Sequence, residues 1–217
     1  MSSEVLVRGD GEVRTLPDRA IVSVAVEAEG DSQAQAFTAA SRSAATVDAV
    51  LDKYAEGIDR RITVGVVVRP KTRWKKGESV NVGWVAGRTT VLEIKDLVKL
   101  SQLVSELPVA GASVINGPSW EVDRDNPVHD QARHAAAVDA RRRATAYAEA
   151  LGQHLGALKW LSEPGLRLAG QQPAVMARAA GMFRAGPVPT EEPLDISPDE
   201  VTIHATVEAC FELMPDG

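Results

Sequence analysis

The sequence predicts an α+β fold, in which an antiparallel sheet of about seven strands has three helices packed on one face. Three observations predict this class. Most expected strands alternate apolar and polar residues, which indicates strands buried on one face only. These strands come in hairpin-like pairs, whereas the strands of a buried parallel sheet would be apolar throughout. Three longer segments instead repeat apolar residues every three or four positions, as amphipathic helices do.

Two strands are expected within the first 30 residues. Residues 5–7 form a short apolar run, and Gly9-Asp10-Gly11 is interpreted as a turn that ends it. Residues 20–29 alternate, with valine at every second position on one face. Just before this strand, Asp18 is expected to accept backbone N–H bonds and to fix the start of the strand, rather than to bind a ligand.

Each of the three helices has a recognisable start. Ser32 and Gln35 fit a capping box before the first helix, and Asp96 can cap the second. Asn126-Pro127 favours the start of the third helix, because proline suits the first helical turn. The expected inner stripes are Phe37, Ala40, Ala44, Val47, Leu51 and Tyr54 in the first helix, and Ala132, Ala136, Ala140, Ala144, Tyr147 and Leu151 in the third. The small residues of the third stripe allow that helix to lie close to whatever it covers.

The other expected strands are 62–70, 80–94, 114–122, 158–161 and 201–213. The first two form a hairpin whose polar tip is residues 71–79. Residues 163–200 contain half of the chain's twelve prolines and are expected to form a long loop or flap. The sequence thus predicts a single domain, residues 1–217, with this loop inserted near its end.

Charge and cysteine content exclude several classes of protein. The net charge of −6 argues against a general nucleic-acid binder, which needs a basic face. A single cysteine, Cys210, excludes an intrachain disulfide and a cysteine-based zinc cluster. We find no membrane span and no recognisable secretory signal, so the expected location is cytoplasmic, or periplasmic or exported if a leader has been removed.

Several stretches, taken together, resemble the SIMPL-domain family. They are Gly9 to Val13, Pro17 to Ala20, Gly83 to Leu100, Ile115 to Trp120, Asp139 to Gly152 (of the form DARxxAxxYAxxLG) and Phe211 to Leu213. Their order and spacing are specific, and they cover the chain except for 71–79 and 163–200. The resemblance implies an α+β fold with no established catalytic activity. It also implies that bacterial members are mostly exported, that some are surface antigens or linked to oxidative stress, that some form large homo-oligomers, and that an animal member is a kinase-associated adaptor. The lack of a recognisable export signal departs from the bacterial pattern.

Two groups of residues are candidates for interaction. Trp74, Lys75 and Lys76 place an aromatic ring among cations at the expected hairpin tip. That tip is interpreted as a solvated turn or as an arm for subunit contact, and contact with nucleic acid or anionic lipid is the alternative. Met182 and Phe183 lie among prolines and would expose apolar groups that can dock on another chain.

The sequence therefore favours a non-catalytic binding or assembly protein, acting as a homo-oligomer, with another protein as a further possible partner and a stress or signalling role. We expect no catalytic residue, no metal and no cofactor, since the four histidines are scattered. The competing hypothesis is a hydrolase-like enzyme with a cleft beside the polar face of the last strand, where His204, Glu208 and Glu212 would act as acids and bases. Cys210 lies on that same strand face and is expected to be partly exposed and inert.

Overall fold

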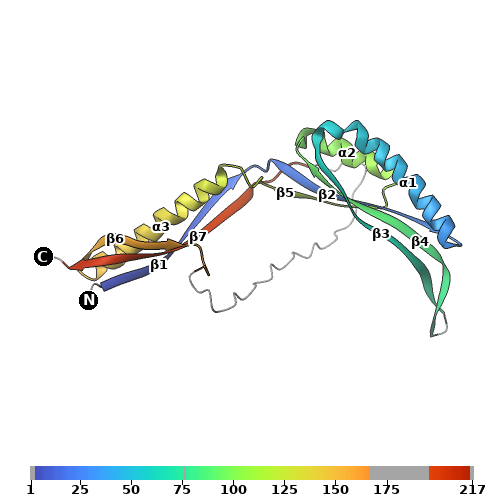
Figure 1. Cartoon of the computed structure of the whole chain (residues 1–217). Coiled ribbons are helices and arrows are strands. Elements are labelled where there is room, and N and C mark those ends of the chain that lie inside the picture. The colour runs from blue at the N-terminus through green and yellow to red at the C-terminus, as the bar shows by residue number, and fades with distance from the viewer. Residues whose placement is uncertain (1–2, 76, 167–195, 216–217) are drawn as a thin grey trace. The chain divides into compact units, whose positions relative to one another are not determined.

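The computed structural model describes residues 3–75, 77–166 and 196–215 (Figure 1). These residues form two compact units. One unit consists of the described residues of 1–15, 124–190 and 200–217, and the other of those of 16–123 and 191–199. The elements follow the predicted order of two strands, a helix, two strands, a helix, a strand, a helix and two strands. Met182 and Phe183 lie outside the described residues, as does most of the expected loop.

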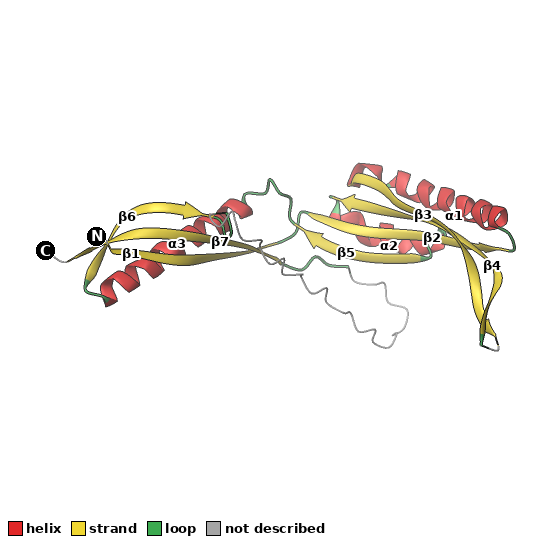
Figure 2. Cartoon of the chain, turned by 60° about the horizontal axis from the view of Figure 1, so that its bottom comes forward, coloured by secondary structure: helices red, strands yellow, loops and turns green. Residues whose placement is uncertain are grey.

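The first unit is a three-stranded antiparallel sheet with one helix. Its strands are β1 (Ser3–Thr15), β7 (Val201–Pro215) and β6 (Gln153–Ser162), with β7 in the centre. The helix α3 (Val128–Ala150) packs on β1 and β7 (Figure 2). Its buried stripe is Ala132, Ala136, Ala140, Ala144 and Ala148, each with an exposed fraction of 0%. The prediction was therefore wrong at Tyr147 and Leu151, which are exposed.

The interpretation of Gly9-Asp10-Gly11 as a turn is wrong, because these residues lie in the middle of the continuous strand β1. They pair with β7 without interruption. A Cβ atom added to Gly9 would lie 2.2 Å from the carbonyl oxygen of Ala136, and one on Gly11 would lie 2.1 Å from that of Ala132. The glycines are needed because the backbone of α3 approaches β1 closely, as the alanine stripe of α3 allows.

Polar contacts also join α3 to β1. The backbone N–H of Asp10 donates to Oδ2 of Asp139 at 3.0 Å, and Arg143 contacts the carboxylates of both Asp139 (2.7 Å) and Asp10 (3.0 Å). Hydrogen bonds from Arg142 and from the Asp10 amide lower the pKa of Asp139 from 3.8 to about 2. Asp139 therefore remains ionised at neutral pH and holds the two elements together.

The second unit is a four-stranded antiparallel sheet with two helices. Its strands are β2 (Arg19–Gly30), β3 (Ile58–Lys75), β4 (Glu78–Ile94) and β5 (Val114–Glu121), in the order β3-β4-β2-β5. The helices are α1 (Gln33–Lys53) and α2 (Leu97–Val109), and a short 3-10 helix (Ala55–Gly57) follows α1. The core of this unit is Ala20, Val22, Val24, Val26, Val47, Val50, Leu51, Leu92, Ile94, Leu100, Leu103, Leu107 and Ala110. Both helices thus cover the same face of β2, which is the face that the alternating valines predicted.

Local signals in the sequence were reliable in this unit. The Ser32 hydroxyl accepts from the N–H of Gln35, and Asp96 accepts from that of Lys99, so both predicted caps are confirmed. Asp18 does accept a backbone N–H, as expected. The donor is Asp123, at 2.8 Å, which follows β5, so the bond closes the β2–β5 pair rather than a local turn.

The fold class is confirmed as α+β, with seven antiparallel strands and three helices among the described residues. The strands form two sheets, of three and four strands, and not the single sheet expected. Alternation fixes the buried face of a strand but not its neighbours, so it cannot separate one sheet from two.

Candidate functional site

Strand β3 is the most open part of the second unit. It forms the outer edge of its sheet, and among the described strands it pairs only with β4. All of its 18 residues are exposed except Ile58, Ile62 and Lys71, which are partly buried. An edge strand presents unpaired backbone N–H and C=O groups to solvent, and most proteins protect such edges with charges, prolines or short strands.

Several cationic side chains on β3 form ion pairs with acidic residues of the same unit. Arg60 contacts Glu93 of β4 at 3.6 Å, and Arg69 contacts Glu27 of β2 at 3.7 Å. Arg61 is engaged by two aspartates of α1 and Lys71 by Glu29. Because these cations are paired with acids of the same unit, they protect the free edge less than solvated cations would.

Between the charged stretches, residues 63–68 contain no charge and no proline. The four valines of this run have exposed fractions of 58% (Val64), 65% (Val66), 40% (Val67) and 41% (Val68). A β-branched, uncharged and exposed stretch on an edge strand is the usual signature of a strand that pairs with another chain.

A shallow groove lies between α1 and β3, because α1 covers β2 and β4 and makes few contacts with β3. Its volume is about 240 Å³. The walls are mainly apolar and include Phe37 and Ala44 from α1, Val66 from β3 and Ala86 from β4. Phe37 was predicted as core, but half of its surface is exposed, and it lines this open groove.

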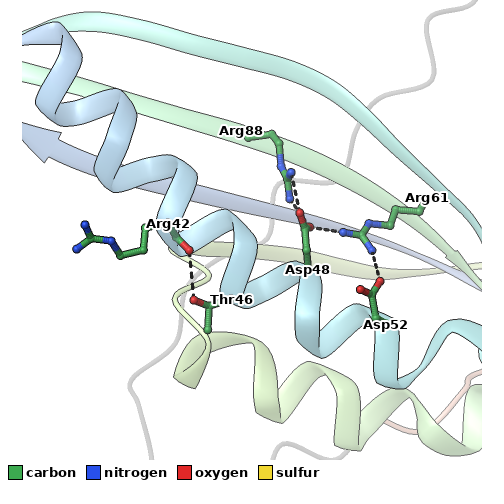
Figure 3. A network of polar contacts seen from close by, with 6 residues as sticks. All are labelled: Arg42, Thr46, Asp48, Asp52, Arg61 and Arg88. Atoms are coloured by element: carbon green, nitrogen blue, oxygen red, sulfur yellow. Dashed lines mark hydrogen bonds and ion pairs between the residues drawn. The ribbon is translucent and has the colours of Figure 1, made fainter.

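An ionic network adjoins the groove, which Asp48 and Arg88 help to line (Figure 3). Asp48 of α1 accepts from Arg88 of β4 and from Arg61 of β3, and Arg61 also donates to Asp52 at 3.0 Å. Partial burial alone would raise the pKa of Asp48, but the two guanidinium groups outweigh it and hold the pKa below 3.8. The network therefore fixes β3 to α1 while leaving the outer edge of β3 free.

The far end of the hairpin forms a two-stranded arm. Pairing between β2 and β4 ends at Gly30 and Trp84, so β3 is the only described strand that pairs with residues 78–83 of β4. The arm bends away from the rest of its sheet in Figure 1. Trp74 lies near its end with 75% of its surface exposed, and Lys75 is also exposed. Lys76 falls outside the described residues.

The proposed acid and base residues of the last strand are not brought together. Each has a different neighbour: His204 lies 4.0 Å from Glu12, Glu208 pairs with Arg8 at 3.0 Å, and Glu212 with Lys159 at 3.3 Å. Each lies four positions from the next along an extended strand, a distance of roughly 13 Å. Among the described residues, no three His, Cys, Asp or Glu side chains are grouped as metal ligands would be.

Cys210 is buried, with an exposed fraction of 3%, contrary to the expectation of partial exposure. β7 is the central strand of its sheet, so side chains of β1 and β6 flank Cys210 on both sides. The strand face that carries Cys210, which the alternation marks as polar, is therefore buried at this position. Its Sγ lies 3.5 Å from Oε2 of Glu4 in β1, and it pairs in register with Trp160 of β6. Burial keeps this thiol away from solvent oxidants.

A family model described as "SIMPL: Protein of unknown function (DUF541)" matches residues 5–211, which include both units. The chain belongs to the SIMPL family. Two proteins called "26 kDa periplasmic immunogenic protein", from Brucella melitensis and Brucella abortus, are each 25% identical to this SIMPL protein over 224 residues. The alignments cover 97% of this chain and 85% of each relative.

Those relatives are periplasmic by name, which does not support the cytoplasmic location expected from the sequence. In the described part of the chain, no helix has the length and apolar character needed to cross a bilayer.

Proposed function

We propose that this SIMPL protein is a non-catalytic assembly protein that associates with itself through the free edge of β3. The observation that supports this most directly is the exposed, uncharged run of residues 63–68 on β3, whose outer side pairs with no strand of the described chain. Pairing with the same edge of a second copy would satisfy the open backbone groups and bury the valines of both copies.

The distribution of charge supports a second copy as the occupant. The cations that flank the run on β3, such as Arg61 and Arg69, are already paired with acids inside the unit. Two such edges can therefore approach with less repulsion than the composition of β3 suggests.

At the opposite edge of the sheet, β5 is short and its register is interrupted, which makes β3 the better edge for pairing.

The test is the mass of the native particle in solution, measured by light scattering at micromolar concentration. We expect a multiple of the 23.1 kDa chain mass. Val66→Lys should weaken association by at least about tenfold, because the contact would bury an unpaired ammonium group. The matched control is Val98→Lys on α2, where the valine is 89% exposed and far from the edge in sequence. A wild-type monomer, or equal assembly of both variants, would contradict the proposal.

We also propose that the protein acts outside the cytoplasm, because its Brucella relatives are named as periplasmic proteins. Fractionation of cells that produce the native gene product tests this directly. If the protein is recovered only in the fraction that contains cytoplasmic markers, the cytoplasmic location expected from the sequence would be supported instead.

A further inference from the structure

The end of the β3–β4 arm has an exposed apolar surface. Trp74 is 75% exposed, and two valines of β4, Val80 and Val82, are 43% and 46% exposed. In the register of the hairpin, Trp74 lies opposite Ser79 and Val80 lies opposite Arg73. The apolar groups are therefore on both faces of a two-stranded arm, which no helix of the described chain covers.

The arm also has cations without acidic partners. Along β3, the cations up to Lys71 make ion pairs, whereas Arg73 and Lys75 make none among the described residues. Residues 71–82 contain four cations and one acid, Glu78, in a chain whose net charge is −6. Unpaired positive charge is thus concentrated beside the most exposed aromatic ring of the described chain.

We propose that this arm docks on the surface of an anionic lipid bilayer. Tryptophan prefers the interface between headgroups and acyl chains, where its ring is apolar on one side and its N–H can reach water or a headgroup. The tip would enter the interface end-on, with Trp74 on one face of the arm and Val80 and Val82 on the other, while Arg73 and Lys75 contact lipid phosphates. The arm suits this role because it is narrow and lies beyond the helix-covered part of its sheet.

A nucleic acid is a poorer match for the same charges. Binding along a phosphate backbone requires a basic groove that follows several nucleotides. Here the cations toward the base of the hairpin are neutralised by ion pairs, so only the tip remains basic. A small basic tip with an aromatic ring and valines fits a flat, anionic and partly apolar surface better.

The experiment is co-sedimentation of the full chain with vesicles of phosphatidylglycerol and phosphatidylcholine in equal parts, and with vesicles of phosphatidylcholine alone. We expect binding to the anionic vesicles only, weakening as salt rises because the attraction is screened. Removing two cations in Arg73→Gln/Lys75→Gln should lower the partition coefficient on the order of 25-fold, at about fivefold per cation. Trp74→Ala should also lower it.

The controls are Arg42→Gln, which removes an exposed cation of α1, and Val98→Ala on α2. Both should bind vesicles as the wild type does, and thermal unfolding should show that every variant is folded. Light scattering in lipid-free buffer should give each variant the wild-type mass, which separates this inference from the proposed assembly through β3.

Three results would overturn the inference. One is equal binding to neutral and anionic vesicles, or binding to neither. The second is a Trp74→Ala variant that binds vesicles normally but has a smaller native mass, which would assign the tip to a second copy. The third is binding of the wild type to a single-stranded oligonucleotide but not to vesicles, which would assign it to nucleic acid.

Discussion

The close approach of α3 to β1 gives a sharp prediction about Gly9 and Gly11. A Cβ on Gly11 would lie 2.1 Å from the carbonyl oxygen of Ala132. Carbon and oxygen atoms in contact are about 3.3 Å apart, so α3 would have to move by roughly 1 Å. Overpacking that side chains can absorb costs about 1–3 kcal/mol. The obstacle here is backbone, so we expect Gly11→Ala to lower the free energy of unfolding by at least about 3 kcal/mol.

The matched control is Gly65→Ala, which also lies in a strand but has no atom within 4 Å of the added Cβ. We expect it to change stability by less than about 0.5 kcal/mol, as surface substitutions usually do. Urea unfolding followed by far-ultraviolet circular dichroism measures both variants, and Gly9→Ala should behave as Gly11→Ala does. If Gly11→Ala is as stable as Gly65→Ala, α3 does not contact β1 as described, and the interpretation of residues 9–11 as a turn would be favoured again.

Three further predictions concern charge and metal. The pKa of Asp139 is lowered from 3.8 to about 2, so its contribution to stability should be full above pH 4 and should be lost as the pH falls from about 4 to 2. In Asp139→Asn, the free energy of unfolding measured by circular dichroism should therefore depend less on pH over that range. Asp48→Asn should lower the unfolding free energy by about 1–3 kcal/mol, because two arginines lose their anionic partner and one of its two acceptor oxygens. A double-mutant cycle with Arg88→Gln should show coupling, and additive effects would argue against the network. Elemental analysis should find no stoichiometric transition metal, and a single alanine substitution at each of the four histidines should leave the biological role intact. One metal per chain, or one histidine variant that folds but has lost the biological role, would support the enzyme hypothesis. Those histidines are His129, His134, His154 and His204.

Features determined by neighbours in the chain were predictable from the sequence. The order of strands and helices, the caps at Ser32 and Asp96, and the buried valine face of β2 each depend on residues within a few positions of one another. The hairpin itself was also predictable, because a polar stretch with a glycine between two alternating runs indicates a turn. Its expected tip, 71–79, was too long, since β3 continues to Lys75 and β4 begins at Glu78.

Features determined by distant contacts were not predictable. The role of Gly9 depends on Ala136, more than 120 residues away, and a glycine beside a helix backbone looks in sequence like a turn glycine. Phe37 fits the helical period of α1, but the period cannot show that α1 leaves β3 uncovered. Cys210 lies on a polar strand face whose burial depends on β1 and β6. The free edge itself depends on the strand order β3-β4-β2-β5, which alternation does not determine.

The two proposed roles use the same hairpin but different atoms, so they can be separated. Self-association uses the outer backbone groups of residues 63–68 and the valines beside them, within the part of β3 that ion pairs fix to α1. Membrane contact uses Trp74 and the unpaired cations of the arm, beyond the last residue of β2 in the ladder. If both hold, an assembly joined at β3 would present several arms to one bilayer, and binding would exceed that of a single arm by effective concentration alone. Val66→Lys should then weaken vesicle binding indirectly, through loss of assembly, whereas neutralising Arg73 and Lys75 should directly reduce the salt dependence of binding.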